Sequence, residues 1–155
     1  DGTSVWTITH AHDVATAMRG LLDTPAAEGR AVHVTSTEAL TWMGLHRTIA
    51  HAAGLSDEAF EAQVVNVPTA ALVAAMPSQR GSLYGDKMHG AVYDTSLIEE
   101  LVPEWRATIP FAEGARRAVA AFEARSEWQT IDDAANEVFD RLGRIYRDAL
   151  GAAAT

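Results

Sequence analysis

Ala31-Val32-His33-Val34-Thr35 is the stretch of sequence that decides the fold. Its β-branched residues favour a strand, and the run is apolar enough to be buried on both faces. A buried strand needs a neighbouring strand on at least one edge, because its backbone groups must be hydrogen-bonded. The rest of the sequence offers no obvious neighbour, so we expect a partner segment beyond these residues.

Helices and short strands are predicted on either side of this run. Trp6 to Thr9 is a short β-prone segment, and Asp13 stands where a helix cap is expected, before apolar residues at helical spacing. Downstream, Thr41 is placed to cap a helix that ends at Gly54. Gln63 to Val67 predicts a third strand.

The second half of the sequence predicts mainly helices. Residues 69–76 form a short helix in this prediction, and further helices begin near Asp94, Pro110 and Asp132. Between them, residues 78–93 are rich in glycine and predict a long loop with at most one helical turn, a feature that is usually functional or mobile. On the last helix, the residues expected to face inward are Ala135, Val138, Phe139, Leu142, Ile145 and Tyr146.

Composition narrows the class of protein. The chain has 155 residues, of which 48% are hydrophobic and 21% charged, so it can form a globular core. It has no cysteine, which excludes disulfides, thiolate metal sites and a cysteine nucleophile. The net charge of −9 disfavours nucleic-acid binding. No apolar run is long enough to span a membrane, and we expect a cytoplasmic protein that binds neither nucleic acid nor membrane.

The common catalytic motifs are missing from the sequence. There is no Gly-x-Gly-x-x-Gly turn, no Gly-Lys-Ser/Thr phosphate loop, no Gly-x-Ser-x-Gly elbow and no Tyr-x-x-x-Lys pair. We therefore expect no catalytic and no cofactor-binding residues in this chain. A chain with the layout of an enzyme but without these groups is either a binding module or part of a larger enzyme.

Histidine is the one catalytic residue type with several copies. His10 and His12 have the spacing of some metal ligands, but no carboxylate or further histidine supports them, and we expect no metal site. His33 is interpreted as a core histidine of the strand. His89, close to Lys87, is either a solvated loop residue or a substrate-binding one.

Several segments, taken in order, resemble the extended short-chain dehydrogenase/reductase family, the NAD-dependent epimerase/dehydratases. Asp1-Gly2-Thr3 followed by residues 9–15 (Thr-His-Ala-His-Asp-Val-Ala) looks like the Gly-Asp-Gly … [His/Tyr]-Val-x-Asp-Val-Ala passage of that family. Residues 29–36 resemble its Gly-x-x-Tyr-Asn-Ile-Gly-Ser strand, and residues 41–54 resemble the helix that follows.

The likeness continues through the second half of the chain. Tyr93-Asp94-Thr95-Ser96 with Leu101-Val102-Pro103 is similar to the family's Asp-x-Ser-Lys-x-x-x-x-Leu-Gly-x-x-Pro passage, and residues 109–114 are similar to the Leu-x-Glu-Gly start of its penultimate helix. The resemblance spans nearly the whole chain in the family's order.

This resemblance implies a helix-rich α/β fold, namely the C-terminal portion of a Rossmann-like extended short-chain dehydrogenase/reductase with its small substrate-binding lobe. Residues 10–55 would hold the last Rossmann strand and its flanking helices. Residues 1–9 and 56–125 would form the substrate-binding lobe, and residues 126–155 the C-terminal helix. The abrupt opening on Asp1-Gly2 would be the turn before the strand of the lobe.

The resemblance also implies that cofactor binding and substrate binding lie in different parts of the protein. The glycine-rich turn and the catalytic Tyr-x-x-x-Lys pair would lie upstream, in an N-terminal Rossmann part of the same protein that binds NAD or NADP. The present chain would be the substrate-binding part of an epimerase, dehydratase or reductase and would not be catalytically competent alone. Its expected partners are that N-terminal part, a small-molecule substrate and, in a homodimer, a second copy.

Two departures from the family bear on the substrate. Nucleotide-sugar members usually carry one arginine shortly after the Gly-Asp-Gly turn and another before a later Gly-Asp, and these positions fall at Trp6 and about Leu83. Apolar residues there argue against a nucleotide sugar, because a guanidinium group matches phosphate oxygens. We expect a smaller or less anionic carbonyl or hydroxyl substrate, bound by Trp6, Leu83, Lys87 and His89. Lys87 or Arg80 would restore an anion site in a shifted register.

Two other interpretations stay open on the sequence alone. One is a non-catalytic module of the same fold that binds a nucleotide or a partner. The other is a stand-alone helical domain whose likeness to the family is accidental.

Overall fold

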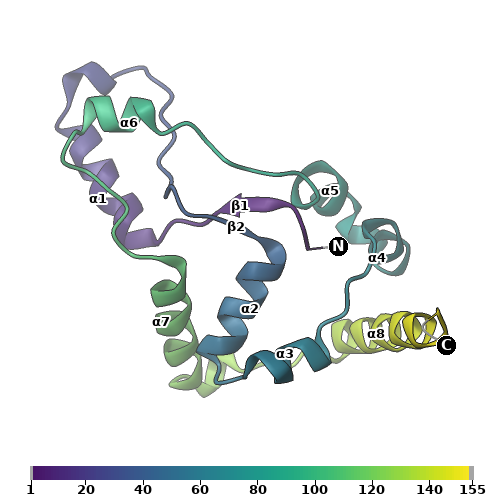
Figure 1. The fold of residues 1–155 in the computed structure, drawn as a ribbon. Coiled ribbons are helices and arrows are strands. Elements are labelled where there is room, and N and C mark those ends of the chain that lie inside the picture. Colours follow the sequence, from purple (N-terminus) through teal and green to yellow (C-terminus); the bar gives the residue numbers. More distant parts are fainter. Residues whose placement is uncertain (1, 154–155) are drawn as a thin grey trace.

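The computed structural model describes residues 2–153 and shows a helix-rich chain with a small two-stranded sheet (Figure 1). The turn predicted at Asp1-Gly2 begins outside the described residues. The elements, in chain order, are β1 (Val5–Thr7), α1 (Ala11–Leu22), η1 (Pro25–Ala27), β2 (Ala39–Thr41), α2 (Trp42–Ala52), α3 (Asp57–Gln63), α4 (Thr69–Ala75), η2 (Pro77–Gln79), α5 (Arg80–Ser82), η3 (Leu83–Lys87), α6 (Ser96–Leu101), α7 (Phe111–Glu123), η4 (Ser126–Trp128) and α8 (Asp133–Ala153).

The sheet joins the start of the chain to the entry of α2. β1 and β2 are antiparallel, with Trp6 opposite Leu40. On its other edge, β1 forms a parallel bridge to Ala91, whose backbone N–H donates to Val5 O at 2.7 Å and whose carbonyl accepts from Thr7 N at 3.1 Å. The β-prone segment predicted at residues 6–9 is therefore a strand, shifted by about one residue. β2 was not predicted.

The strand predicted at Ala31–Thr35 does not form. The side chains alternate between exposed and half-buried from Ala31 to Val34, as in a strand, and Val32 and Val34 pack against the core. Among the described residues, however, this segment makes no backbone-to-backbone hydrogen bond. The side-chain pattern of a strand is present, but a strand to pair with is not among these residues.

The strand predicted at Gln63–Val67 is also wrong. Gln63 is the last residue of α3, a helix capped by Ser56, whose Oγ accepts from Ala59 N at 3.2 Å. Residues 64–68 continue as an irregular segment. Valines favour a strand only where another strand is available for pairing, and this segment has none among the described residues.

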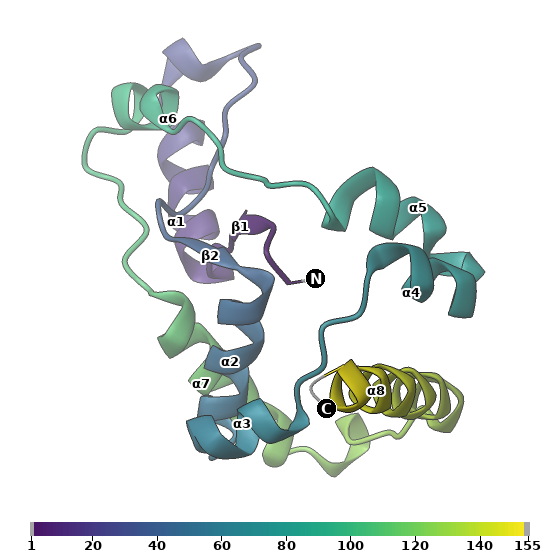
Figure 2. The same ribbon diagram turned by 45° about the vertical axis from the view of Figure 1, so that its right-hand side comes forward.

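The main core lies between α1 and α6. It contains Ala17, Ile98, Leu101, Val102 and Trp105, all buried. Figures 1 and 2 show the two helices side by side at one end of the molecule. The core also secures α1, because the indole N–H of Trp105 donates to the carbonyl oxygen of Asp13 at 2.9 Å.

Asp13 is a buried core residue and not the predicted helix cap. His10 caps α1 instead, because its Nδ1 accepts from His12 N at 3.1 Å. The Asp13 carboxylate accepts hydrogen bonds from Ile109 N at 3.0 Å and Thr108 Oγ1 at 3.1 Å. Burial acts to raise the pKa of Asp13, but these hydrogen bonds outweigh it, and the pKa lies below its ordinary value. One carboxylate thus ties α1 to the segment that leads into α7.

The region predicted as a long loop, residues 78–93, is largely helical. Short helical turns run from Pro77 to Lys87, and the last of them, η3, is a π-helical turn. The glycines of this segment led to the loop prediction, but Gly81 and Gly85 lie within the helical turns with open space around them. Single π-helical turns are rare and often occur at functional sites.

α2 follows the prediction closely. Its cap is Thr41, whose Oγ1 accepts from Gly44 N at 3.0 Å, and beyond its end Gly54 adopts a φ of 84°. α7 packs against one side of α2, and α3 lies close to its C-terminal half (Figure 1). The helices that begin near Asp94 and Pro110 are likewise present as α6 and α7.

α8 begins where predicted, with Asp132 Oδ1 accepting from Ala135 N at 3.0 Å. Fewer of its predicted inward-facing residues are buried than expected. Leu142 is buried, but Phe139 and Ile145 are each 54% exposed. In Figures 1 and 2 the helix lies below α4 and apart from the core. No helix among the described residues combines the length and the apolar composition needed to cross a membrane.

Candidate functional site

A lysine lies against two tryptophans where β1, α2 and η3 meet. Pairing of β1 with β2 brings Trp6 close to Trp42, the first residue of α2, and their ring centroids are 5.5 Å apart. Nζ of Lys87 lies 4.4 Å from the centroid of the Trp6 ring and 5.9 Å from that of Trp42. This geometry allows cation–π attraction, which holds the ammonium group against the indole rings.

Hydrogen bonds fix the segment around Lys87 to β1 and α2. The carbonyl oxygen of Lys87 accepts from Ser4 Oγ at 2.8 Å and from Trp42 Nε1 at 3.2 Å. Trp6 Nε1 donates to the carbonyl oxygen of His89 at 3.0 Å, across 83 residues of sequence. The backbone bridge between β1 and Ala91 continues the same attachment. Both indole N–H groups are therefore used to position the end of η3.

Two charged or polar side chains of this segment have partners within it. Lys87 Nζ lies 2.6 Å from Asp86 Oδ2 in an exposed ion pair. The imidazole Nε2 of His89 is 3.0 Å from the carbonyl oxygen of Tyr84 in the π-helical turn. The ammonium group is thus partly compensated, and the ring of His89 is engaged with its own loop.

A cavity of about 540 Å³ opens beside this cluster. Its walls come from the start of the chain, α2, the irregular segment after α3, the beginning of α4, η3 and α8. The lining residues are Gly2, Ser4, Trp42, Met43, His46, Gln63, Val64, Val65, Asn66, Val67, Thr69, Leu72, Leu83, Lys87, Met88, Phe139, Asp140, Leu142, Gly143 and Arg147. A cavity of this size matches those that hold small molecules.

The four residues predicted to bind substrate divide into two pairs. Leu83 and Lys87 line the cavity. Trp6 and His89 are not among the lining residues, and they contact Lys87 or hold its backbone segment in place. The structure brings Trp6, Lys87 and His89 together, although Trp6 is distant from the others in sequence. Arg80, considered as a substitute anion ligand, lies over the ring of Tyr84, with Cζ 5.3 Å from the ring centroid.

Sequence reasoning missed the wall contributed by α8. The sequence predicts that Phe139 and Leu142 pack inward. No prediction concerned Gly143 or Arg147. A glycine in the middle of a 21-residue helix is the signal that was available, because glycine is unfavourable there. The irregular valine segment after α3 also lines the cavity, where the sequence predicts a strand.

A second, mostly apolar groove of about 840 Å³ runs along α7. Phe122 and Trp128 are exposed on it, and Ile49 of α2 forms part of its opposite wall. Its cation, Arg117, is already paired with Glu113 at 2.6 Å. None of the residues predicted to bind substrate lies in this groove, which has fewer polar groups to orient a ligand than the cavity beside Lys87.

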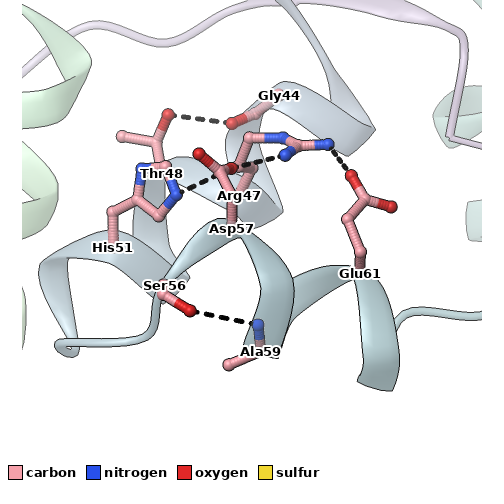
Figure 3. A network of polar contacts seen from close by, with 8 residues as sticks. All are labelled: Gly44, Arg47, Thr48, His51, Ser56, Asp57, Ala59 and Glu61. Carbon is pink, nitrogen blue, oxygen red and sulfur yellow. Dashed lines mark hydrogen bonds and ion pairs between the residues drawn. The ribbon is translucent and has the colours of Figure 1, made fainter.

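A polar network joins α2 to α3, and Figure 3 shows it from close by. Arg47 bonds to Asp57 at 2.6 Å and also to Glu61, and His51 Nε2 lies 3.2 Å from the same oxygen of Asp57. The hydrogen bond from Arg47 lowers the pKa of Asp57, with a smaller contribution from His51. These side chains are largely exposed and saturated by one another, so the network holds two helices together and has no free group for chemistry.

His33 is the histidine interpreted as a core residue of the strand predicted at residues 31–35. The ring centroid of His33 lies 4.9 Å from that of Tyr93, and His33 is exposed, so its interpretation as a core residue is wrong. Within residues 2–153, no group of three histidine, aspartate or glutamate side chains is close enough to hold a metal ion. Comparisons with protein-family models, curated proteins and solved structures found no match to this chain.

Proposed function

We propose that this chain is the substrate-binding part of an NAD(P)-dependent epimerase, dehydratase or reductase that acts on a carbonyl or hydroxyl compound. The carrying observation is the meeting of Trp6 with Lys87 and His89. Trp6 was singled out because it occupies a substrate-lobe position of the family that the sequence resembles, and His89 because it is a histidine close to Lys87 in the predicted long loop. Their convergence beside a 540 Å³ cavity supports that resemblance.

The segment Ala31–Thr35 supports a partner for this chain. Its inner side chains pack on the core, while its backbone groups have no backbone partner among the described residues. Exposed backbone groups of an extended segment readily pair with another strand. In the proposal, that strand belongs to an N-terminal Rossmann part of the same protein.

The described residues do not themselves offer a cradle for a dinucleotide. No glycine-rich turn leads from a strand into a helix here, since α1 follows His10 and α2 follows Thr41. In the proposal, the cofactor and the catalytic tyrosine belong to the upstream part, as the resemblance implies. This chain would bind the substrate, orient it and exclude water from it.

The side chains at the cavity favour a substrate other than a nucleotide sugar. The family positions for diphosphate-binding arginines hold Trp6 and Leu83, and Lys87 is partly neutralised by Asp86. A diphosphate carries several oxygens that are best bound by more than one guanidinium group. A smaller compound with less negative charge fits this set of residues better.

The test is an assay of the full-length gene product in which these residues occur. A reductase should oxidise NADH or NADPH with small carbonyl compounds, whereas an epimerase or dehydratase should convert small hydroxyl compounds with no net change in the cofactor, so nicotinamide absorbance and reaction products are both measured. Neither reaction is expected with nucleotide sugars. Lys87→Met is expected to reduce kcat/KM, while Arg19→Gln, at an exposed position of α1 that does not line the cavity, serves as the matched control.

Two results would contradict the proposal. A full-length sequence without a Tyr-x-x-x-Lys pair would remove the catalytic role and leave a non-catalytic binding module of the same fold. If Trp6→Arg left the substrate range of the intact enzyme unchanged, Trp6 would be no determinant of the site.

A further inference from the structure

The cavity wall formed by α8 contains an arginine laid across a glycine. A Cβ atom added to Gly143 would lie 3.2 Å from Nη2 of Arg147 and 3.5 Å from its Cζ and Nη1. The guanidinium group therefore covers the bare backbone of Gly143, which is buried. Glycine in a helix interior costs about 1 kcal/mol relative to alanine. The glycine allows the guanidinium group to lie flat at the edge of the cavity.

Among the described residues, Arg147 differs from Lys87 in the cavity and Arg117 in the α7 groove because it has no anionic partner. Lys87 is paired with Asp86 and Arg117 with Glu113. Within residues 2–153, Arg147 forms no ion pair and no side-chain hydrogen bond. Its five N–H donors are available to a ligand with the planar geometry of a carboxylate.

The charges of the lining residues favour one negative charge on the ligand. The cations of the cavity are Lys87 and Arg147, and its carboxylate is Asp140, which leaves a formal excess of one positive charge. The chain as a whole carries −9. A local positive excess in an acidic chain attracts an anion to this place, while Asp140 disfavours a ligand with several negative charges.

The rest of the cavity is suited to an apolar body. Trp42, Leu72, Leu83 and Leu142 contribute apolar side chains to its wall. Ligand cavities typically combine such a wall with a few polar groups that fix orientation. Here the polar group that would orient the ligand is the guanidinium of Arg147, and Lys87 offers a second positive charge next to the tryptophans.

We propose that this cavity binds a small monocarboxylate with an apolar body, whose carboxylate forms a paired hydrogen bond with Arg147. The inference deepens the proposed function and rests on it for one point only: if the cavity is the substrate site, the substrate is a hydroxy or oxo acid. Arg147 is then a substrate-positioning residue contributed by the C-terminal helix.

The experiment is isothermal titration calorimetry on the full-length protein without cofactor. The probe is 3-phenylpropanoate, and its uncharged counterpart 3-phenylpropanamide and inorganic phosphate are measured beside it. We expect the carboxylate to bind, and both the amide and phosphate to bind more weakly by roughly tenfold or more, because one loses the charge and the other the apolar contact.

Variants of α8 identify the group that binds. Arg147→Gln is expected to weaken carboxylate binding by roughly ten- to a hundredfold. Arg147→Lys should weaken it by less, because lysine keeps the positive charge but lacks the planar pair of N–H donors. Gly143→Ala displaces the guanidinium group and should weaken binding without lowering the melting temperature. The matched controls are Arg144→Gln and Gly151→Ala, on the same helix and away from the cavity, and they should bind as the unmodified protein does.

The outcomes separate this inference from the proposed function. The inference is overturned if the carboxylate does not bind, or if Arg147→Gln binds it as tightly as the unmodified protein does. It is also overturned if the amide or phosphate binds as tightly as the carboxylate. Carboxylate binding that depends on Arg147, in a protein that neither oxidises NADH or NADPH with an oxo acid nor converts a hydroxy acid, supports the binding site and contradicts the enzyme. Enzyme activity in a protein that does not bind the carboxylate supports the proposed function and contradicts the carboxylate as the ligand class of the cavity.

Discussion

The packing around α1 and α6 contrasts with the packing around α8. In the first region, Ala17 and Ile98 have no exposed surface, and the buried carboxylate of Asp13 is fully engaged by hydrogen bonds. In the second, Phe139 and Ile145 are each 54% exposed on either side of buried Leu142. The first region is organised for stability. The second leaves apolar surface and a free guanidinium group beside a cavity, as ligand binding requires.

The sharpest test of this contrast is the same truncation made in both regions. Ile98→Ala removes a fully buried side chain and should lower the free energy of unfolding by about 3–5 kcal/mol. Leu142→Ala should lower it by only about 1–2 kcal/mol, because one side of Leu142 already faces the cavity and has fewer contacts to lose. Urea denaturation measures both changes. Equal losses would show that α8 is packed as tightly as the core.

The next test concerns Asp13, the buried polar group of the core region. Asp13→Ala leaves the N–H of Ile109 and the hydroxyl of Thr108 without their acceptor, which should lower the free energy of unfolding by about 2–4 kcal/mol. Asp13→Asn is the matched variant, because it keeps the shape and one acceptor oxygen. It should be less destabilising, as measured by denaturation at pH 7.

The same residue predicts a pH dependence. The pKa of Asp13 is lowered in the folded protein, so its contribution to stability is fully present above the unfolded pKa of about 4 and is lost as pH falls through the folded value. The unmodified protein should therefore lose more stability than Asp13→Asn does as pH falls below about 4. Parallel acid profiles for the two proteins would contradict the role assigned to the carboxylate.

Features that depend on residues close together in the sequence were easier to predict than features that depend on distant residues. The caps at Thr41 and Asp132 act within one helical turn, and both were predicted. The cap predicted at Asp13 was wrong, because Thr108 and Ile109, which are distant in sequence, hold its carboxylate. Strands at residues 31–35 and 63–67 were wrong, because strand formation depends on a distant partner that composition does not reveal. β2 was missed for the same reason, since it forms through pairing with β1.

The site divides along the same line. Trp6 and Leu83 were singled out through the resemblance to one family, and Lys87 and His89 because they lie close together in the predicted loop. The structure brings Trp6 to Lys87 and His89. The wall from α8 could not be inferred in that way, because no local signal says which element a terminal helix will contact. The glycine in the middle of that helix, at position 143, is the one unusual feature at the cavity wall.

Two glycines provide a smaller test of the contrast in packing. A Cβ atom on Gly20 would lie 2.6 Å from Cγ1 of Val102 in the core, so Gly20→Ala should cost about 1–3 kcal/mol. Gly151 of α8 has open space around it, and Gly151→Ala should be neutral or stabilising by up to about 1 kcal/mol. Thermal denaturation of the two variants compares them directly. A destabilised Gly151→Ala would indicate a neighbour of α8 that limits the space there.

The smallest expected effect concerns a guanidinium group that does have a partner. Glu113 on α7 bonds to Arg116 at 2.7 Å and to Arg117 at 2.6 Å, and these contacts lower its pKa from 4.5 to about 2. A carboxyl-detected NMR titration should find this value in the unmodified protein. Arg116→Gln should raise the pKa of Glu113 towards 4.5, because the strongest hydrogen bond is removed, whereas Arg144→Gln on α8 should not change it.

The sign of the accompanying stability change follows from the lowered pKa. The contribution of Glu113 is present above pH 4.5 and is lost as pH falls towards 2, and it should be small because the pair is exposed. Salt should weaken it further, since exposed charges are screened. An unshifted pKa for Glu113 at low salt would mean that Arg117 is free on the wall of the α7 groove. In that case an unpaired arginine would no longer distinguish the cavity at α8 from the second groove.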